Sequence, residues 1–173
     1  MTILVKNCFG SYQFYNESKK LVCKIKSLKI IGPQKEVFDS KGKLVFTTDI
    51  QIADNGGQMN PSKYVSYFFP STSKVAATAT LELDGDERAS LPVKLPAVIG
   101  LCIKSVYGDI KLKKIRNREL SIFSGRQEIG HIVVSPFYKA SLIDCETIDN
   151  AEFLAVLFVF SIYMIHEDDV YIV

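Results

Sequence analysis

The chain has 173 residues, 47% of them apolar, and its 21 Lys and Arg face 19 Asp and Glu for a formal net charge of +2. This length fits one domain over residues 1–173, and the apolar share argues against an intrinsically disordered chain. The first residues lack the basic and long apolar regions of a signal peptide, so the expected location is cytoplasmic. The four cysteines are widely spaced, which favours buried or half-buried free thiols over a disulfide framework or a zinc site.

The charges are divided unequally along the chain. Residues 1–139 hold all 21 basic residues against 12 acids, a balance of +9, whereas residues 140–173 hold seven acids and no Lys or Arg, a balance of −7. The acids are Asp144, Glu146, Asp149, Glu152, Glu167, Asp168 and Asp169. Mutual compensation on folding is the simplest account, and the alternative is a basic outer surface with an acidic end.

Most of the first 145 residues predict short strands separated by turns. Residues 21–26 alternate in polarity, a turn at 39–42 precedes a period-2 segment at 44–52, and residues 53–62 predict the longest loop. Residues 77–83 alternate again. Long amphipathic segments that would serve as crossover helices are missing between these stretches, which disfavours a parallel α/β sheet.

The second half of this region continues the same pattern. Ile110 and Leu112 alternate with Lys111 and Lys113, and residues 117–118 predict a turn. Strands are then expected around residues 120–122 and 129–134, separated by a turn at 124–126. About a dozen strands at ten-residue spacing predict an antiparallel barrel or sandwich.

Residues 150–165 differ in kind because they are apolar on every side, which predicts a buried helix. Asp149 is the expected N-cap, with Glu152 three residues later. A long strand is the alternative, but the unbroken apolar run exceeds a usual strand length. A 16-residue helix spans roughly 24 Å, short of the ~30 Å hydrocarbon core of a bilayer, and its flanks are acidic. An integral membrane protein is therefore not expected.

The expected position of this helix is the interior of a closed barrel, which side chains alone would fill poorly. The side chains expected to be nearly inaccessible are Leu154, Leu157, Phe158, Phe160 and Ile162.

Residues 38–46 and 123–132 share an aromatic residue, a Gly-containing turn and a strand, and residues 149–165 supply the apolar helix. With these features the chain resembles the tubby C-terminal-like superfamily, which includes tubby proteins, phospholipid scramblases and LURP-one-related proteins, bacterial members among them. The resemblance covers nearly the whole chain. It implies a mainly β fold, a closed antiparallel barrel of about twelve strands around the C-terminal helix.

The functional parts of that superfamily have only partial counterparts here. Tubby proteins bind phosphoinositides through basic residues on the barrel, and no particular Lys or Arg of this chain aligns with them. Scramblases carry an acidic segment proposed to bind calcium before the helix. Asp144, Glu146 and Asp149 occupy a similar place with a different spacing, so they are weak metal candidates beside the simpler interpretation as a solvated acidic turn.

Basic residues in two stretches are the candidate binding site for an anionic ligand. They are Lys24, Lys26, Lys29, Lys111, Lys113, Lys114, Arg116 and Arg118. On the outside of a barrel they would attract anionic lipid head groups, each contributing about 1 kcal/mol near a charged membrane. The simpler interpretation is a solvated face whose lysines protect strand edges. No arrangement of Tyr12, Tyr15 and Tyr107 forms a stacking platform, so a nucleic-acid partner is not expected.

His131 and His166 are the two histidines, and no nucleophile motif lies near either, so no catalytic residue is assigned. The Gly-Gly pair at residues 56–57 lacks a phosphate-binding lysine, and no cofactor is expected. The sequence therefore predicts a non-enzymatic intracellular binding or scaffold module, engaging an anionic lipid or membrane surface through a basic barrel face. The alternatives are a small-ligand or enzymatic barrel with a site at an open end, beside His131 or the acidic turn, and a protein-interaction subunit.

Overall fold

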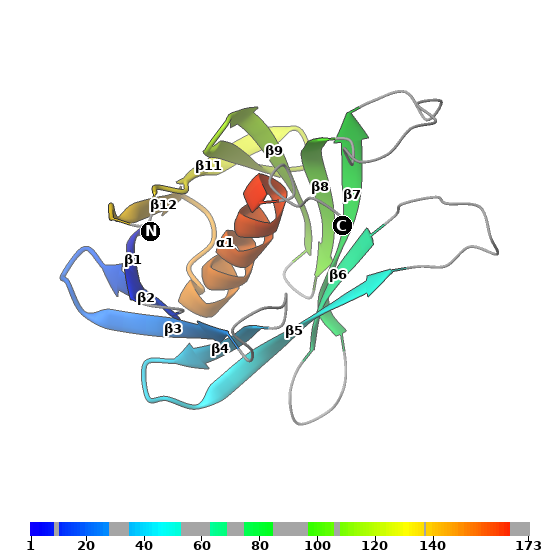
Figure 1. The fold of residues 1–173 in the computed structure, drawn as a ribbon. Helices are drawn as coiled ribbons and strands as arrows, with labels where there is room; N and C mark the ends of the chain where they lie inside the picture. The colour runs from blue at the N-terminus through cyan, green and yellow to red at the C-terminus, as the bar shows by residue number, and fades with distance from the viewer. Residues whose placement is uncertain are drawn as a thin grey trace.

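The computed structural model of the chain describes residues 1–8, 11–27, 35–52, 63–68, 75–84, 97–105, 108–136 and 138–166. Side chains are described within these ranges except at 48–52, 63–68, 75–84, 97–99 and 166. Among these described residues, strands surround one helix, α1, whose axis runs through the middle of the molecule (Figure 1).

In the part of the chain that the structure describes, twelve strands precede the helix. Their bounds are β1 Thr2–Cys8, β2 Ser11–Asn16, β3 Leu21–Ser27, β4 Lys35–Asp39, β5 Leu44–Ile52, β6 Lys63–Phe68, β7 Val75–Asp84, β8 Ala97–Ser105, β9 Gly108–Arg116, β10 Glu119–Ser124, β11 Gln127–Val133 and β12 Ser141–Cys145, and α1 is Ala151–His166.

Each strand pairs antiparallel with the strands before and after it in sequence, and β1 also pairs with β12, so the pairings form a ring. In that last pairing Thr2 lies opposite Asp144 and Val5 lies opposite Ser141. The expected mainly β, antiparallel fold with a C-terminal helix is confirmed. Consecutive pairing requires only short turns, which explains why turn residues recur at regular spacing.

Alternation of side chains decides which face of each strand is inside. In β1, Ile3 and Val5 are buried while Leu4 is exposed, and in β12 Ile143 and Cys145 are buried. The turn between β4 and β5 depends on Asp39, whose Oδ1 accepts hydrogen bonds from the backbone N–H groups of Lys41 and Lys43 at 2.9 and 2.8 Å. Gly42 follows with φ of 81°, a conformation that favours glycine.

Helix α1 begins one residue later than the expected cap implies. Asn150, not Asp149, is the N-cap: its Oδ1 accepts a hydrogen bond from the backbone N–H of Phe153 at 2.7 Å. Both residue types cap well, and the sequence pattern did not distinguish two adjacent candidates. Glu152 still lies in the first turn, where its charge suits the helix dipole.

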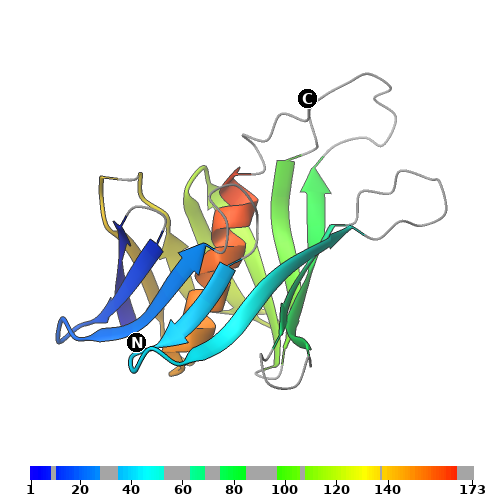
Figure 2. The same cartoon turned by 60° about the horizontal axis from the view of Figure 1, so that its bottom comes forward.

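The helix is enclosed by strands along its length, as the turned view shows (Figure 2). It packs against β3, β4 and β8, and the Phe158 ring meets the rings of Tyr12 and Phe14 edge-on at centroid distances of 5.4 and 5.5 Å. The five side chains expected to be nearly inaccessible are all at most 5% exposed. The only buried hydroxyl on the helix, that of Ser161, donates to the Leu157 carbonyl at 2.9 Å, so it costs little to bury.

Among the residues that the structure describes, no helix is long and apolar enough to cross a membrane.

Candidate interaction surface

The eight basic residues singled out in the sequence do not form one patch. Lys24 and Lys26 lie on β3, whereas Lys111, Lys113, Lys114 and Arg116 lie on β9 with Arg118 in the following turn. In the ring β3 and β9 are six strands apart in either direction, and they lie on opposite sides of α1 (Figure 1). Lys29 lies outside the described residues. The described basic residues therefore lie on two separate surfaces, and local sequence does not reveal this because it does not show which strands face away from each other.

The two lysines of β3, Lys24 and Lys26, lie opposite residues of the neighbouring strand β4. Lys26 lies opposite Glu36 in the β3–β4 register, and its Nζ is 5.0 Å from the centre of the Phe38 ring. Lys24 lies opposite Phe38 in the same register. Lys26 is therefore explained as a partner of an acid and an aromatic ring, and Lys24 as a cross-strand neighbour of the same ring.

The other side of the molecule carries an apolar row on its outside. Val133, Leu142, Leu4 and Tyr15 are successive cross-strand neighbours on β11, β12, β1 and β2, and all four alternate with buried residues. Ile115 lies beyond this row on β9, at a bulge where Glu119 pairs with Arg116 and Leu120 with Lys114. Leu4 is 40% exposed and Ile115 is 54% exposed. Apolar side chains in such positions increase the water-exposed apolar area of the fold.

Tyr138 adds an aromatic ring beside this row. It lies in the connection between β11 and β12, is 79% exposed, and has the Lys139 Nζ 5.9 Å from its ring centre. Among the described residues the exposed large hydrophobic side chains are Leu4, Ile115 and Tyr138, and all three belong to the same side of the ring. We call the outward-facing residues of β9, β10, β11, β12, β1 and β2, with the β11–β12 connection, the outer arc.

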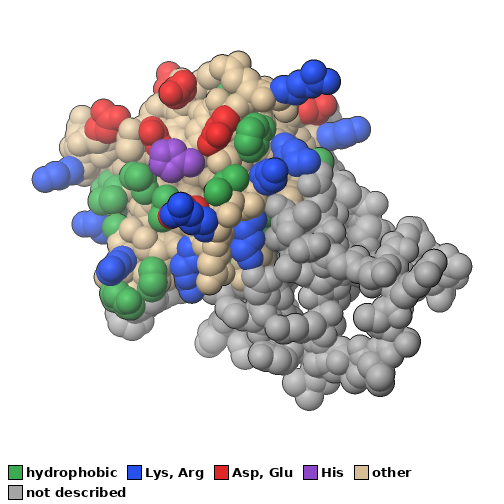
Figure 3. All heavy atoms as spheres, turned by 90° about the horizontal axis from the view of Figure 1, so that it is seen from above, with side chains coloured by type: hydrophobic (Ala, Val, Ile, Leu, Met, Phe, Trp, Pro, Cys, Tyr) green, Lys and Arg blue, Asp and Glu red, His purple; other side chains and the backbone are tan. Residues whose placement is uncertain are grey.

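Hydrophobic, basic and acidic side chains are interspersed on this side of the molecule around a histidine (Figure 3). A polar row runs beside the apolar one. Its cross-strand neighbours are Lys113, Ser121, His131, Asp144 and Thr2, on five adjacent strands. Asp144 Oδ1 accepts a hydrogen bond from Thr2 Oγ1 at 3.1 Å. The outer arc therefore offers apolar contact and charge in adjacent rows.

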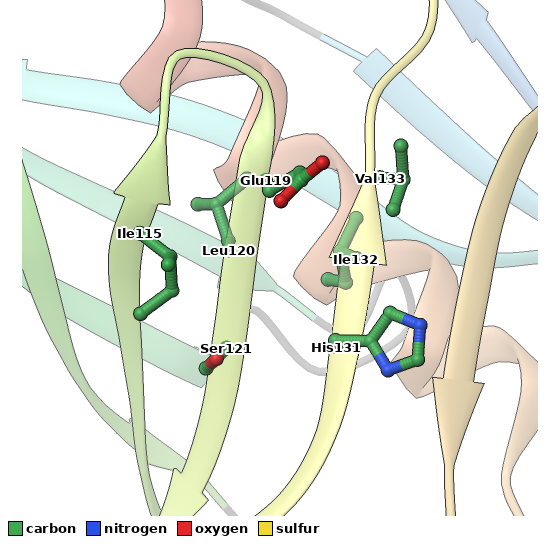
Figure 4. Close-up of a pocket in the computed structure, with 7 residues that line it drawn as sticks. All are labelled: Ile115, Glu119, Leu120, Ser121, His131, Ile132 and Val133. Carbon is green, nitrogen blue, oxygen red and sulfur yellow. The ribbon is translucent and has the colours of Figure 1, made fainter.

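A shallow pocket of about 140 Å³ opens on the outer arc between β9, β10 and β11 (Figure 4). Its lining residues are Ile115, Glu119, Leu120, Ser121, His131, Ile132 and Val133. Ser121 is 6% exposed, whereas His131 and Ile115 stand at the surface. The volume suits an apolar side chain or a similarly small group.

Ser121, His131 and Asp144 are neighbours in the register, yet they do not form a catalytic triad. In the described part of the chain neither Ser121 nor His131 makes a side-chain hydrogen bond or ion pair, and Asp144 is engaged by Thr2. A nucleophilic serine needs a base that takes its proton and donors for the developing oxyanion. The β10 strand is paired on both sides, so its ladder engages the backbone N–H groups around Ser121.

The acidic turn does not assemble a metal site in the part of the chain that the structure covers. Asp144 is half-buried, Glu146 and Asp149 are exposed, and no group of three or more His, Cys, Asp or Glu side chains is close enough to hold an ion. The second acidic candidate, residues 167–169, lies outside the described residues.

The rim of the outer arc at the β9–β10 turn carries two arginines. Arg116 Nε lies 3.8 Å from Glu119 Oε2, with the two side chains 77% and 46% exposed, so this pair contributes little stability. Arg118 is held through its backbone, since its carbonyl accepts a hydrogen bond from the Val134 N–H at 2.9 Å. The two arginines therefore lie next to the pocket, Arg116 at the end of β9 and Arg118 in the turn that follows it.

The four cysteines are free thiols, as expected, but they differ in position. Cys23 and Cys145 are buried and Cys8 is half-buried, whereas Cys102 is exposed on β8, contrary to the expectation of buried or half-buried thiols. Cys102 lies between inward-facing Leu101 and Ile103, so alternation turns it outward. Burial, and secondarily the Glu152 charge, raise the pKa of the Cys23 thiol well above its usual range.

No protein-family model matches the sequence, and no curated protein matches it. Among solved structures, the fold is similar to the X-ray structure of the Arabidopsis thaliana protein AT5G01750, with a TM-score of 0.58. The alignment covers 94% of this chain and 89% of that chain, at 13% sequence identity. At this identity the likeness concerns the fold alone.

Proposed function

We propose that the protein is a non-enzymatic binding module that engages anionic phospholipid surfaces through its outer arc, and that it is a tubby-like barrel related to the LURP-one-related proteins. The twelve-strand ring around an apolar helix and the likeness to the Arabidopsis protein support the second part. The observation that carries the first part is the coincidence of the exposed hydrophobic residues Leu4, Ile115 and Tyr138 with basic residues on one side of the molecule.

The position of the helix favours an outside site over an inside one. Barrels that bind small molecules keep an internal space for them, whereas α1 fills the interior here with side chains that are almost entirely buried. A ligand of this fold therefore meets the outer surface, and a flat or shallow surface fits a membrane better than it fits a small solute.

Two contributions act together in this proposal. Basic residues near an anionic membrane each contribute about 1 kcal/mol, and the outer arc offers Lys113, Arg116 and Lys139, with Arg118 at its rim. Exposed apolar side chains that enter the interface add about 25 cal/mol per Å² of area removed from water. Tyr138 combines an apolar ring with a polar tip, which suits the head-group region.

Sedimentation with vesicles of phosphatidylserine and phosphatidylcholine tests the proposal. We expect binding that rises with the anionic fraction and falls with added salt. The double substitution Ile115→Ser and Tyr138→Ser, and separately Lys113→Glu with Arg118→Glu, should each reduce binding by tenfold or more. The matched control Lys24→Glu with Lys26→Glu reverses two charges on β3, on the opposite side of α1 from β9, and should reduce binding less than twofold. Absence of salt-sensitive binding to anionic vesicles would exclude the proposal.

A second candidate function rests on the pocket beside His131, which agrees with the alternative of a small-ligand or enzymatic site. It requires a ligand that bridges Ser121 and His131 in a space of about 140 Å³. Esterase assays with p-nitrophenyl acetate, comparing the wild-type chain with Ser121→Ala, decide it: an equal background rate in both removes the enzymatic version.

The third alternative, a protein-interaction subunit, would use the same outer arc. It predicts a specific partner in pull-downs, and Ile115→Ser should abolish the binding of that partner.

A further inference from the structure

His131 lies near the middle of the outer arc. It belongs to β11, which has β9 and β10 of the arc on one side and β12, β1 and β2 on the other. Ile132, the next residue, is buried, so alternation turns the His131 side chain outward, where it is exposed. Its imidazole ring extends from β11 on the side that faces away from β10 (Figure 4). A positive charge on this ring therefore appears in the centre of the outer arc.

Carboxylates flank His131 on both neighbouring strands. On the β12 side Asp144 is its direct cross-strand neighbour, and the exposed Glu146 follows two residues later. On the β10 side its cross-strand neighbour is Ser121, and Glu119, two residues before Ser121, lines the same pocket. Among the described residues His131 itself makes no side-chain hydrogen bond or ion pair. Acidic side chains therefore lie around a ring that no described side chain neutralises by contact.

The other charged groups of this region are a further acid on the same strand and two cationic groups. Glu128 is exposed on β11 itself. Lys113 lies on β9, two strands from His131 in the polar row. The Met1 ammonium group donates a hydrogen bond to the Cys145 carbonyl at the end of β12. Helix α1 lies on the inner face of the sheet, away from the imidazole (Figure 1). In the strand register the acids of β10 and β12 are thus nearer to the imidazole than Lys113 is.

The protonation state of the imidazole changes the net charge of this part of the arc. With a neutral His131, the carboxylates of Asp144 and Glu146 on the neighbouring strand repel an approaching anionic surface. Histidine is the side chain whose charge ordinarily changes between about pH 5 and 8, whereas carboxylates ordinarily keep their charge down to about pH 5. Lowering the pH within this interval therefore adds positive charge without removing negative charge.

We propose that protonation of His131 strengthens the binding of the outer arc to anionic phospholipid surfaces, so that the affinity rises as the pH falls from about 7.5 to about 5.5. This inference rests on the proposed function and names its regulation. The protonated ring adds one positive charge, which attracts the lipid phosphates and offsets the neighbouring carboxylates. By linkage, the anionic surface favours the protonated ring to the same extent that protonation favours the surface.

Sedimentation with vesicles of phosphatidylglycerol and phosphatidylcholine measures the effect, because phosphatidylglycerol keeps its charge over this pH range. One added positive charge should tighten binding about fivefold at the lower pH relative to the higher pH. Most of this rise should disappear at high salt, which screens the charges. Vesicles of phosphatidylcholine alone should show no rise, since they carry no net charge.

Substitutions assign the rise to one side chain, because the chain has only two histidines. His131→Gln stays neutral, so its affinities at the two pH values should differ less than twofold. His131→Lys stays charged, so at the higher pH it should bind as tightly as the wild-type chain does at the lower pH. The matched control His166→Gln removes the other histidine and should keep the full rise. Circular dichroism at both pH values checks that each variant is folded.

The outcomes separate this inference from the proposed function. Equal affinities of the wild-type chain at the two pH values, or a rise that survives in His131→Gln, overturn the role of His131 and leave membrane binding standing. Weak binding of folded His131→Lys at the higher pH also overturns it, because the charge is then not the cause of the rise. If the wild-type chain binds anionic vesicles at neither pH, both the proposed function and its regulation fail.

Discussion

Helix α1 and the outer arc are both rich in large apolar side chains, yet the structure uses them in opposite ways. Nearly every side chain of α1 is buried, whereas the outer arc leaves Leu4, Ile115 and Tyr138 exposed. Apolar character alone therefore does not distinguish a core from a contact surface in this chain. The difference is that strands cover the side chains of α1, whereas water covers those of the outer arc. We therefore expect substitutions in α1 to change the stability of the fold and substitutions in the outer arc to change binding.

The largest expected effect is in the helix. Phe158→Ala removes a ring that is 0% exposed and touches Tyr12 and Phe14, so we expect a loss of about 3–5 kcal/mol in the free energy of unfolding. Urea denaturation followed by circular dichroism measures it. The outer counterpart Tyr138→Ala should change stability by less than about 0.5 kcal/mol. Equal losses of unfolding free energy for Phe158→Ala and Tyr138→Ala would contradict the different burial of the two rings.

A smaller effect is expected where one strand backbone approaches another. A Cβ on Gly130 would collide with the Asp144 carbonyl oxygen and lie 2.8 Å from the Cys145 Cα. Both obstacles are backbone atoms of β12, so Gly130→Ala should cost about 1–3 kcal/mol by forcing β11 and β12 apart. Thermal unfolding of this variant is compared with that of Gln127→Ala, an exposed position on the same strand. Equal melting temperatures for Gly130→Ala and the wild type would show that the two strands separate without cost.

Asp149 and Asn150 are adjacent residues at the start of α1, but only one of them caps the helix. Asn150 accepts the hydrogen bond from the Phe153 N–H, so Asn150→Ala should cost about 1 kcal/mol. Asp149 is exposed, and Asp149→Ala loses only its interaction with the helix dipole, about 0.3 kcal/mol at low salt. Urea titrations of the two variants measure both values. A larger loss of unfolding free energy for Asp149→Ala than for Asn150→Ala would show that Asp149 is the N-cap.

The smallest effect concerns thiol chemistry rather than folding energy. Burial raises the pKa of Cys23, so the folded state keeps a proton that the unfolded state loses above its ordinary pKa of about 8.5. The resulting stabilisation is complete below that pH and is lost as the pH rises through and above it. At pH 8, Ellman's reagent should modify Cys102 rapidly and Cys23 only after denaturant is added. Mass spectrometry of the labelled peptides identifies each site, and native labelling of Cys23 would contradict its burial.

The fold was predictable where the information is local. Alternation located β3, β5 and β9 closely, and the unbroken apolar run located α1 to within one residue at each end. The cap was wrong because Asp149 and Asn150 are both good caps, and only the backbone conformation decides between them. The candidate site was harder. The basic residues of β3 and β9 were grouped by composition, but the ring places them on opposite sides of the helix.

The outer arc itself had only a weak signal in the sequence. Leu4 lies between Ile3 and Val5 in a continuous apolar run, and in a strand one of three such residues must face the other way. Ile115 lies among basic residues. What brings Leu4 next to Leu142 is the pairing of β1 with β12, a contact between residues far apart in sequence that no local pattern contains.

The pairing of β1 with β12 also sets the order in which the molecule can assemble. During synthesis β1 emerges first among the described elements, yet its second edge has no partner until residues 141–145 have been made, and α1 emerges later still. For most of translation the nascent sheet thus exposes both an open strand edge and the apolar face that α1 later covers. Long-range closure of this kind slows folding and favours aggregation of incomplete chains. Chaperone demand should therefore fall sharply once α1 leaves the ribosome.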